Sequence, residues 1–136
     1  MRVWRYGMMG LLVALLGLKA GCGAKVETSP VSGRITYRGK PVKSGQVLFL
    51  SPNGHPGHSE LDQDGRYQLS AAVGENMVSI ESRGPGTPMA KPTPEGYTKM
   101  LPGKLLIPEK YLSGETSGLR VTVQRGENTA NFELKD

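Results

Sequence analysis

The sequence predicts an all-β protein, an antiparallel two-sheet β-sandwich of about seven strands that follows an N-terminal signal peptide. Three observations predict this fold class. Several segments alternate apolar and polar residues with the period of two that is typical of a half-buried strand. The 136 residues include 19 glycines and 10 prolines, which leave room only for very short helices. Turn sequences that contain glycine separate the alternating segments.

The first strand is expected at residues 31–37, where Val31 and Ile35 fall on one face and Arg34 falls on the other. Residues 46–51 are apolar on both faces, which predicts a more deeply buried strand. The other expected strands cover residues 66–69, 76–82, 119–124 and 130–134. Their inward residues, which we expect in the core, are Tyr67, Leu69, Val78, Ile80, Leu119, Val121, Val123, Ala130, Phe132 and Leu134.

Three turns join these strands. Residues 38–45 place glycines around Pro41, and residues 62–65 (DQDG) predict a tight turn in which Gly65 takes a positive φ. Residues 125–128 (RGEN) are expected to close a hairpin between the last two strands. The DQDG turn resembles the start of a calcium loop, but Ala71 stands where such a loop needs a bidentate Glu, so a turn is the better interpretation.

Residues 83–108 form a proline-rich loop that holds six of the ten prolines. A loop of this length inside a compact domain is generally either functional or disordered. We expect an extended excursion that rejoins the sandwich at residues 105–111, where Leu106, Ile107 and Tyr111 can pack.

The first 21 residues read as a lipoprotein signal peptide. Arg2 and Arg5 form a basic start, and residues 7–18 form an apolar run of 12 that is too short to span a hydrocarbon core of ~30 Å. Small residues then lead directly into Cys22, the only cysteine. We therefore predict lipidation of Cys22, a lipidated tether over residues 22–30, and a sandwich domain over residues 31–136.

The lipidation signal has one departure from the usual pattern, because Lys19 stands three residues before Cys22, where an apolar residue is usual. The alternative is an ordinary secreted protein cut near Ala20. If Cys22 carries lipid, several acyl chains on it would hold the domain permanently at a membrane of the cell envelope. Gly23 follows Cys22 in place of the Asp that retains many lipoproteins at the inner membrane, which favours the outer membrane.

The charge of the chain argues against nucleic-acid binding. The formal net charge is +5, but Arg2, Arg5 and Lys19 lie in the leader, which has no acidic residue. The remaining Lys and Arg are nearly balanced by acids and are scattered, without the clustered basic face that phosphate binding requires. A single cysteine also excludes an intramolecular disulfide and a cysteine-based zinc site within the chain.

The one polar cluster that could hold a metal is at residues 55–62 (HPGHSELD), with His55, His58 and Glu60 as weak candidate ligands. Zinc needs three or four converging ligands, and the Pro and Gly between the histidines set no regular spacing. Two exposed loop histidines are the simpler interpretation. We predict no metal, no cofactor and no catalytic residues, because the chain also lacks a G-x-S-x-G elbow and a cysteine nucleophile in its domain.

Four segments carry a family resemblance: VSGRITYRGKPV at 31–42, GQVLFL at 45–50, DQDGRYQL at 62–69 and the block from 107 to 134. Together they make the chain resemble the small transthyretin-like, or carboxypeptidase-regulatory-like, lipoproteins of planctomycete bacteria. The resemblance implies a prealbumin-type sandwich on a lipid anchor. One enzyme branch of the wider fold group hydrolyses 5-hydroxyisourate and ends in Tyr-Arg-Gly-Ser, whereas residues 132–136 are FELKD, so this activity is not carried over.

The sequence therefore predicts a membrane-anchored, non-enzymatic binding or structural module of the cell envelope. Its partner would be an envelope protein or a polysaccharide, contacted through the exposed loops that include residues 83–108. The alternative is a metal-binding protein or metal-dependent hydrolase that uses His55, His58 and Glu60.

Overall fold

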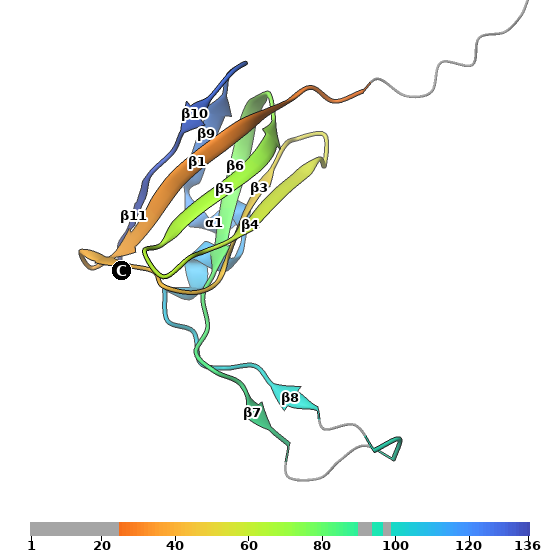
Figure 1. Cartoon of the computed structure of the whole chain (residues 1–136), viewed down its shortest axis with the longest axis vertical. Coiled ribbons are helices and arrows are strands. Elements are labelled where there is room, and N and C mark those ends of the chain that lie inside the picture. Colours follow the sequence, from red (N-terminus) through yellow and green to blue (C-terminus); the bar gives the residue numbers. More distant parts are fainter. Residues whose placement is uncertain (1–24, 90–93, 97–98) are drawn as a thin grey trace, which may run out of the picture.

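A computed structural model describes residues 25–89, 94–96 and 99–136 (Figure 1). Two β-sheets face each other, and a thin ribbon projects from one end of them. The predicted all-β sandwich is confirmed, and the only helices in the described part of the chain are single turns. The leader and Cys22 lie outside the described residues.

The first sheet is built on the long strand β1 (Thr28–Tyr37). Along one edge β1 pairs in antiparallel fashion with β2 (Lys40–Pro41) and β5 (Arg66–Ala72). Along the other edge lie β10 (Asn128–Thr129) and β11 (Phe132–Leu134), both parallel to β1. The first and last strands of the described part of the chain are therefore direct neighbours.

The second sheet has four strands in the order β4-β3-β6-β9, and all of its pairs are antiparallel. Its strands are β3 (Gln46–Leu50), β4 (Pro56–Glu60), β6 (Gly74–Glu81) and β9 (Leu119–Val123). Strand β4 forms one edge of this sheet and lies beside β5, the edge strand of the first sheet.

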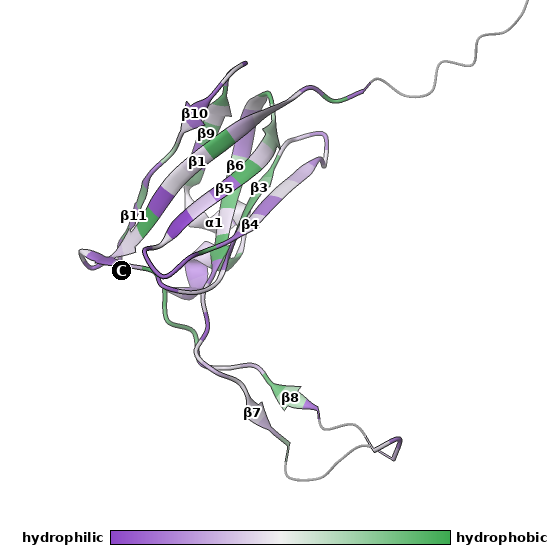
Figure 2. Cartoon of the chain, viewed as in Figure 1, coloured by the Kyte–Doolittle hydropathy of each residue, from purple (hydrophilic) through white to green (hydrophobic). Residues whose placement is uncertain are grey.

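The core fills the space between the two sheets, and its described side chains all come from Val31 to Leu134. An aromatic cluster of Phe49, Tyr67 and Phe132 occupies it, with ring centroids 6.0 to 6.5 Å apart. Hydropathy alternates along the strands, as Figure 2 shows. The predicted inward residues are buried or half-buried, so the predicted strand faces are confirmed. The core side chains of both sheets therefore lie between Val31 and Leu134, although the backbone pairing of the first sheet starts at Thr28.

Strand β4 corrects the expectation that residues 55–60 form a loop. These residues include Pro56 and Gly57, and they lack apolar alternation, yet β4 pairs with the whole of β3. An edge strand is held by main-chain pairing and needs few buried side chains. Gly57 is buried because β4 approaches β5 closely: a Cβ at Gly57 would lie 2.2 Å from the carbonyl oxygen of Ser70.

The prediction of a hairpin at residues 125–128 is wrong. Strand β9 belongs to the second sheet, whereas β10 and β11 belong to the first, so the chain crosses between sheets at this corner. The side chain of Asn128 holds the crossing: its Oδ1 accepts from the N–H of Gln124 at 2.9 Å, and its Nδ2 donates to the carbonyls of Gln124 at 2.8 Å and Gly126 at 2.9 Å. The sequence at residues 125–128 predicts a turn, but it does not indicate which strands pair with the segments before and after that turn.

Two boundaries also differ from expectation. Residues 28–30, assigned to the tether, lie in β1, where Ser29 is buried and pairs with Ala71. Pro30 is tolerated there because β10 pairs with β1 only from Val31 onward, which leaves one edge open. Leu106, expected to pack, is 51% exposed, whereas Ile107 and Tyr111 are buried as predicted.

Two single-turn helices follow the return from the ribbon, η1 (Glu109–Leu112) and α1 (Gly114–Ser117). Ser113 caps α1 by accepting a hydrogen bond from the N–H of Glu115, and Gly118 ends it in a left-handed conformation. The Tyr111 hydroxyl donates to the carbonyl of Lys135 at 2.9 Å and accepts from its N–H at 2.8 Å. This contact fixes η1 against the end of the chain.

The ribbon, which we call the arm, comprises residues 83–105 and starts at a bridge between Arg83 and Leu105. Farther out, β7 (Thr87–Pro88) pairs with β8 (Met100–Leu101). Residues 90–93 and 97–98 lie outside the described part. The expected proline-rich excursion is therefore partly a two-stranded ladder, which sequence periodicity could not reveal because the paired segments are only two residues long.

Candidate functional site

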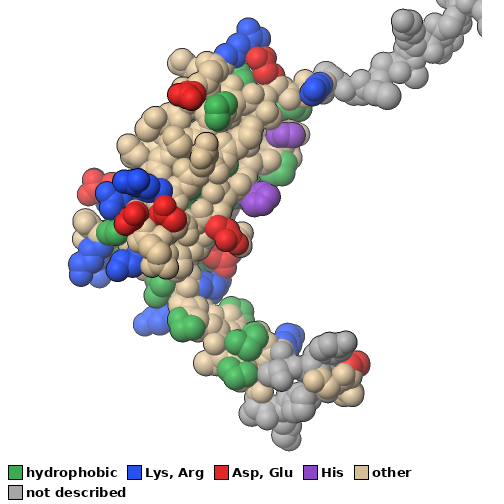
Figure 3. Space-filling model, in the orientation of Figure 1, with side chains coloured by type: hydrophobic (Ala, Val, Ile, Leu, Met, Phe, Trp, Pro, Cys, Tyr) green, Lys and Arg blue, Asp and Glu red, His purple; other side chains and the backbone are tan. Residues whose placement is uncertain are grey.

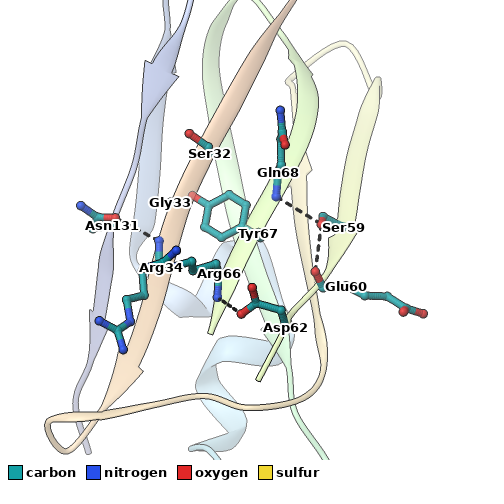
Figure 4. Close-up of a pocket in the computed structure, with 10 residues that line it drawn as sticks. All are labelled: Ser32, Gly33, Arg34, Ser59, Glu60, Asp62, Arg66, Tyr67, Gln68 and Asn131. Carbon is teal, nitrogen blue, oxygen red and sulfur yellow. Dashed lines mark hydrogen bonds between the residues drawn. The ribbon is translucent and has the colours of Figure 1, made fainter. Parts of the chain in front are cut away.

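A polar hollow of about 560 Å³ lies on the outer face of the first sheet, where β1, β5 and β4 meet (Figure 4). The outward side chains of these strands line it because residues two apart share one face of a strand. Its main polar side chains are Ser32, Arg34, Ser59, Glu60, Arg66 and Gln68. We call this site the polar hollow.

Strand register places two arginines directly opposite each other at this site, since Arg34 of β1 pairs with Arg66 of β5. Like charges in such a position repel. Neither guanidinium forms an ion pair with a residue that the structure describes, although the Arg34 Nε donates to the carbonyl of Asp64 at 2.9 Å. The hollow therefore presents two cationic groups to solvent.

The Asp62 carboxylate beside these arginines is held by the backbone. Its Oδ1 accepts from the N–H groups of Arg66 and Asp64, both at 2.8 Å. The Arg66 N–H contributes most to lowering the pKa of Asp62 below its usual range, and the charges of Arg66 and Arg34 add to this effect. The carboxylate organises the predicted turn at 62–65, in which Gly65 has φ 72° as expected.

The floor of the polar hollow depends on Gly33. A Cβ at this position would lie 1.7 Å from the carbonyl oxygen of Ala130, so no larger residue fits without moving the backbone. The Tyr67 hydroxyl donates to the same carbonyl at 2.5 Å. Burial raises the pKa of Tyr67, which keeps this phenol neutral and a hydrogen-bond donor.

The hollow offers hydrogen-bond donors and acceptors, with two cationic side chains, Arg34 and Arg66, beside two anionic ones, Glu60 and Asp62. Among the described residues that line it, none is a histidine or cysteine, and the Ser59 hydroxyl donates to the carbonyl of Glu60 at 2.9 Å. A nucleophilic serine would need an adjacent base to remove its proton. The aromatic ring of Tyr67 is buried against Phe49 and Phe132, so it offers no exposed stacking face.

The predicted metal candidates do not converge. His58 and Glu60 share the exposed face of β4, whereas His55 precedes the strand, in a turn where its N–H donates to the Ser51 hydroxyl at 3.1 Å. The two histidines form separate surface positions (Figure 3). In residues 25–89, 94–96 and 99–136, no group of three or more His, Cys, Asp or Glu side chains could hold a metal ion.

The predicted lipidation site, Cys22, lies outside the described residues, so the structure says nothing about it. No helix within the described ranges is both long enough and apolar enough to cross a membrane.

A second cavity, of about 510 Å³, lies where the arm leaves the sandwich. We call it the arm pocket. Its apolar lining includes Val42 and Ile107, which are buried, and Leu106, which is half exposed. The turn between β1 and β2 and the segment after it supply three cationic side chains, Arg38, Lys40 and Lys43.

Sequence reasoning did not find either cavity. The signal for the polar hollow was the pair of outward arginines, but strand register was needed to bring them together. The signal for the arm pocket was the sequence RGKPVK at 38–43, three basic residues within six positions, which was interpreted only as a turn.

Three solved structures show a distant likeness to this chain. A DUF3823 family protein from Parabacteroides merdae matches with a TM-score of 0.43 and 16% identity over 81% of this chain, which spans 47% of that protein. The dioxygenase domain of a dioxygenase carbohydrate-binding protein fusion from Streptomyces sp. SirexAA-E matches with a TM-score of 0.38 and 18% identity, over 82% of this chain and 80% of that one.

A 9R-lipoxygenase from Cyanothece matches with a TM-score of 0.36 and 11% identity over 76% of this chain, which spans 16% of that protein. No family model matches the chain, and no curated protein sequence does. The chain is thus similar to a β-rich protein of the DUF3823 family, while the transthyretin-like resemblance drawn from its motifs stays a hypothesis.

Proposed function

We propose that this protein is a non-enzymatic binding module of the bacterial cell envelope, held at a membrane by lipid on Cys22 and contacting an envelope partner through the arm. The observation that carries the proposal is the position of the arm, which leaves the sandwich at the end opposite to the start of β1 (Figure 1). A domain tethered through its N-terminal side would present the arm away from the membrane.

The strand pairing explains this geometry. At one end of the sandwich, Thr28 of β1 pairs with Ala72, just before β6 begins at Gly74. Strand β6 then runs the length of the sandwich to Glu81, and the arm starts two residues later at the other end. The tether and the arm are thus separated by the length of one eight-residue strand.

The arm has the chemistry of a contact element. Met89, Met100 and Leu101 are 42%, 56% and 47% exposed, and these apolar side chains gather on the projecting ribbon in Figure 3. A two-stranded ribbon is marginally stable by itself and leaves main-chain groups free along both edges. A partner that adds a strand or covers the methionines would therefore stabilise it.

The charge of the arm indicates which partner fits. Residues 83–105 contain four basic residues and one acidic residue. An envelope protein with an acidic and partly apolar surface would complement both the charge and the exposed methionine and leucine side chains. A polysaccharide surface consists mainly of polar hydroxyl groups and would leave the exposed methionine and leucine side chains unmatched, so we propose the protein partner.

The absence of an enzymatic role is part of the proposal, and the polar hollow supports it. The Asp62 carboxylate accepts hydrogen bonds from two backbone N–H groups, and the Ser59 hydroxyl donates to the backbone carbonyl of Glu60 and not to a side-chain base. The sequence motifs resemble those of transthyretin-like lipoproteins, and for most members of that group no activity is known.

The anchor is tested by mass spectrometry of the mature amino terminus after extraction in detergent. We expect a modified Cys22 as the first residue, fractionation with the outer membrane because Gly23 follows it, and loss of membrane association in Cys22→Ser. An unmodified terminus near Ala20 would contradict the anchor and indicate an ordinary secreted protein.

The arm is tested by site-specific photo-cross-linking in intact cells. A photoreactive residue in place of Met100 should give one protein adduct, and the adduct should disappear when Met89 and Leu101 are both replaced by Gln. The same photoreactive residue at Thr122, which is exposed on β9 and lies outside both candidate sites, is the matched control. Equal labelling from Thr122, or no adduct from Met100, would refute the contact role of the arm.

A further inference from the structure

The arm pocket combines an apolar interior with a cationic rim. Val42 and Ile107 are 6% and 5% exposed and line it from the core side, while Leu106 forms an exposed apolar wall. Its volume of about 510 Å³ falls within the ~300–1,000 Å³ that is typical of small-molecule sites. Such a pocket favours a ligand with an apolar body.

The rim is positive. Arg38, Lys40 and Lys43 line the pocket, and none of its described lining residues is acidic. Lys40 and Lys43 form no ion pair with any described residue. The Arg38 guanidinium contacts both carboxylate oxygens of Asp136, at 2.8 and 3.1 Å, and the Tyr37 hydroxyl donates to the same carboxylate. Both charged side chains of this pair are more than 60% exposed, so an anion that enters the rim meets Lys40 and Lys43 directly and competes with Asp136 for Arg38.

The conformation of Arg38 provides a second, independent observation. Arg38 and Gly39 form the two-residue loop between β1 and β2, and both have positive φ, 52° and 74°. Such a loop favours Asn-Gly, and Arg38 is the only described residue other than glycine with a positive φ. Backbone strain of this kind concentrates at ligand clamps, and here it places a guanidinium on the rim of the pocket.

We propose that the arm pocket binds a small amphiphilic anion, a carboxylate or sulfonate with an apolar body. The anionic group lies between Arg38, Lys40 and Lys43, and the apolar body packs on Leu106 and Ile107. This inference goes beyond the proposed function, because its ligand is a small molecule and its site lies in the sandwich, separate from the exposed ribbon of β7 and β8.

The test uses the chain without its first 22 residues, because the described strands begin at Thr28 and the core side chains lie between Val31 and Leu134. The probe is 8-anilinonaphthalene-1-sulfonate, whose fluorescence rises in an apolar site, and decanoate is used to displace it. We expect saturable one-site binding that decanoate reverses and that decyltrimethylammonium, which has the same tail and the opposite charge, does not. Unsaturable binding, or equal displacement by both compounds, would overturn the proposal.

Arg38→Asn is the decisive variant, because Asn suits the loop and the fold should be kept or improved while the cation is removed. We expect its affinity for the probe to fall by about tenfold or more, as on loss of one charge-assisted contact. Arg125→Gln, which removes a cation paired with Glu27 at the other end of the sandwich, should bind as the parent does. Equal losses in both variants would show non-specific charge attraction and overturn the site.

A second pair of variants separates this proposal from the proposed function. Leu106→Gln should weaken probe binding without changing cross-linking from the arm, whereas Met100→Gln should leave probe binding unchanged. Both side chains are about half exposed, 51% and 56%, so neither change should unfold the domain. Probe binding that is insensitive to Leu106→Gln would overturn the assignment of the ligand to the arm pocket, without bearing on the proposed contact role of the arm.

Discussion

Replacing Gly33 by alanine should destabilise the sandwich, although alanine is ordinarily the better strand residue. In an unconstrained strand the change would gain roughly 0.5–1 kcal/mol. Here the new Cβ would lie 1.7 Å from the carbonyl oxygen of Ala130. The C-terminal segment must therefore move away from β1, so the substitution lowers the free energy of unfolding where an unconstrained strand would gain.

The size of the loss follows from the hydrogen bonds at this point. The N–H of Ala130 donates to the carbonyl of Ser32 at 2.9 Å, Tyr67 donates to Ala130 at 2.5 Å, and the N–H of Arg34 donates to Asn131 Oδ1 at 2.9 Å. At about 1 kcal/mol each, their loss costs about 3 kcal/mol. For a domain of this size that corresponds to a fall in Tm of about 12 °C.

Urea unfolding followed by circular dichroism measures this loss. Gly84→Ala is the matched control, because its Cβ would meet its nearest neighbours at 3.8 and 3.9 Å, which is ordinary contact. The control should stay within about 0.5 kcal/mol of the parent. A Gly33→Ala protein that is as stable as the parent, or more so, would refute the close approach of β1 and the C-terminal segment.

Three further predictions concern the core and the titrating groups. Phe49→Ala removes the fully buried member of the aromatic cluster and should cost about 3–5 kcal/mol in urea unfolding; a cost below 1 kcal/mol would contradict the packing described. Because the pKa of Asp62 is lowered, its carboxylate stabilises the fold above pH 3.8, the ordinary pKa of the group, and this stabilisation is lost as pH falls through the pKa of the folded state. Asp62→Asn should therefore flatten the decline in Tm between about pH 5 and pH 2, and an unchanged slope would argue against the turn contacts. Because the pKa of Tyr67 is raised, its hydroxyl stabilises the fold fully below pH 10.0, the ordinary pKa of the group, and this stabilisation is lost as pH rises above that value. Tyr67→Phe should therefore lose less stability than the parent between about pH 10 and pH 12.

The sequence predicted the faces of the strands because a half-buried strand imposes a period of two on its side chains. Val31 and Ile35 are fully buried and Arg34 is exposed, as that period requires. The short helices followed from the density of glycine and proline. These features depend on local chemistry, which a single sequence contains.

Pairing partners could not be predicted in the same way. Phe132 and Leu134 alternate correctly, but nothing in that alternation says that they join β1 in parallel rather than β9 in a hairpin. The sequence does not predict strand β4, because the residues of this strand, PGHSE, show no apolar alternation. An edge strand of this kind is held by main-chain hydrogen bonds, which leave no pattern in the sequence. The two candidate sites depend on register and on the arm, so they became visible only in three dimensions.

The parallel pairing of β1 with β11 has a consequence for how the protein matures. Ile35 has its neighbour at Phe132, almost a hundred residues later, so the first sheet stays incomplete until the last few residues are available. Contacts of such long range slow folding. A nascent chain therefore cannot complete its first sheet before the residues of β11 have been synthesised. Loss of residues 132–136 would leave Ile35, Thr36 and Tyr37 of β1 without a partner strand along that edge and ready to associate with another chain.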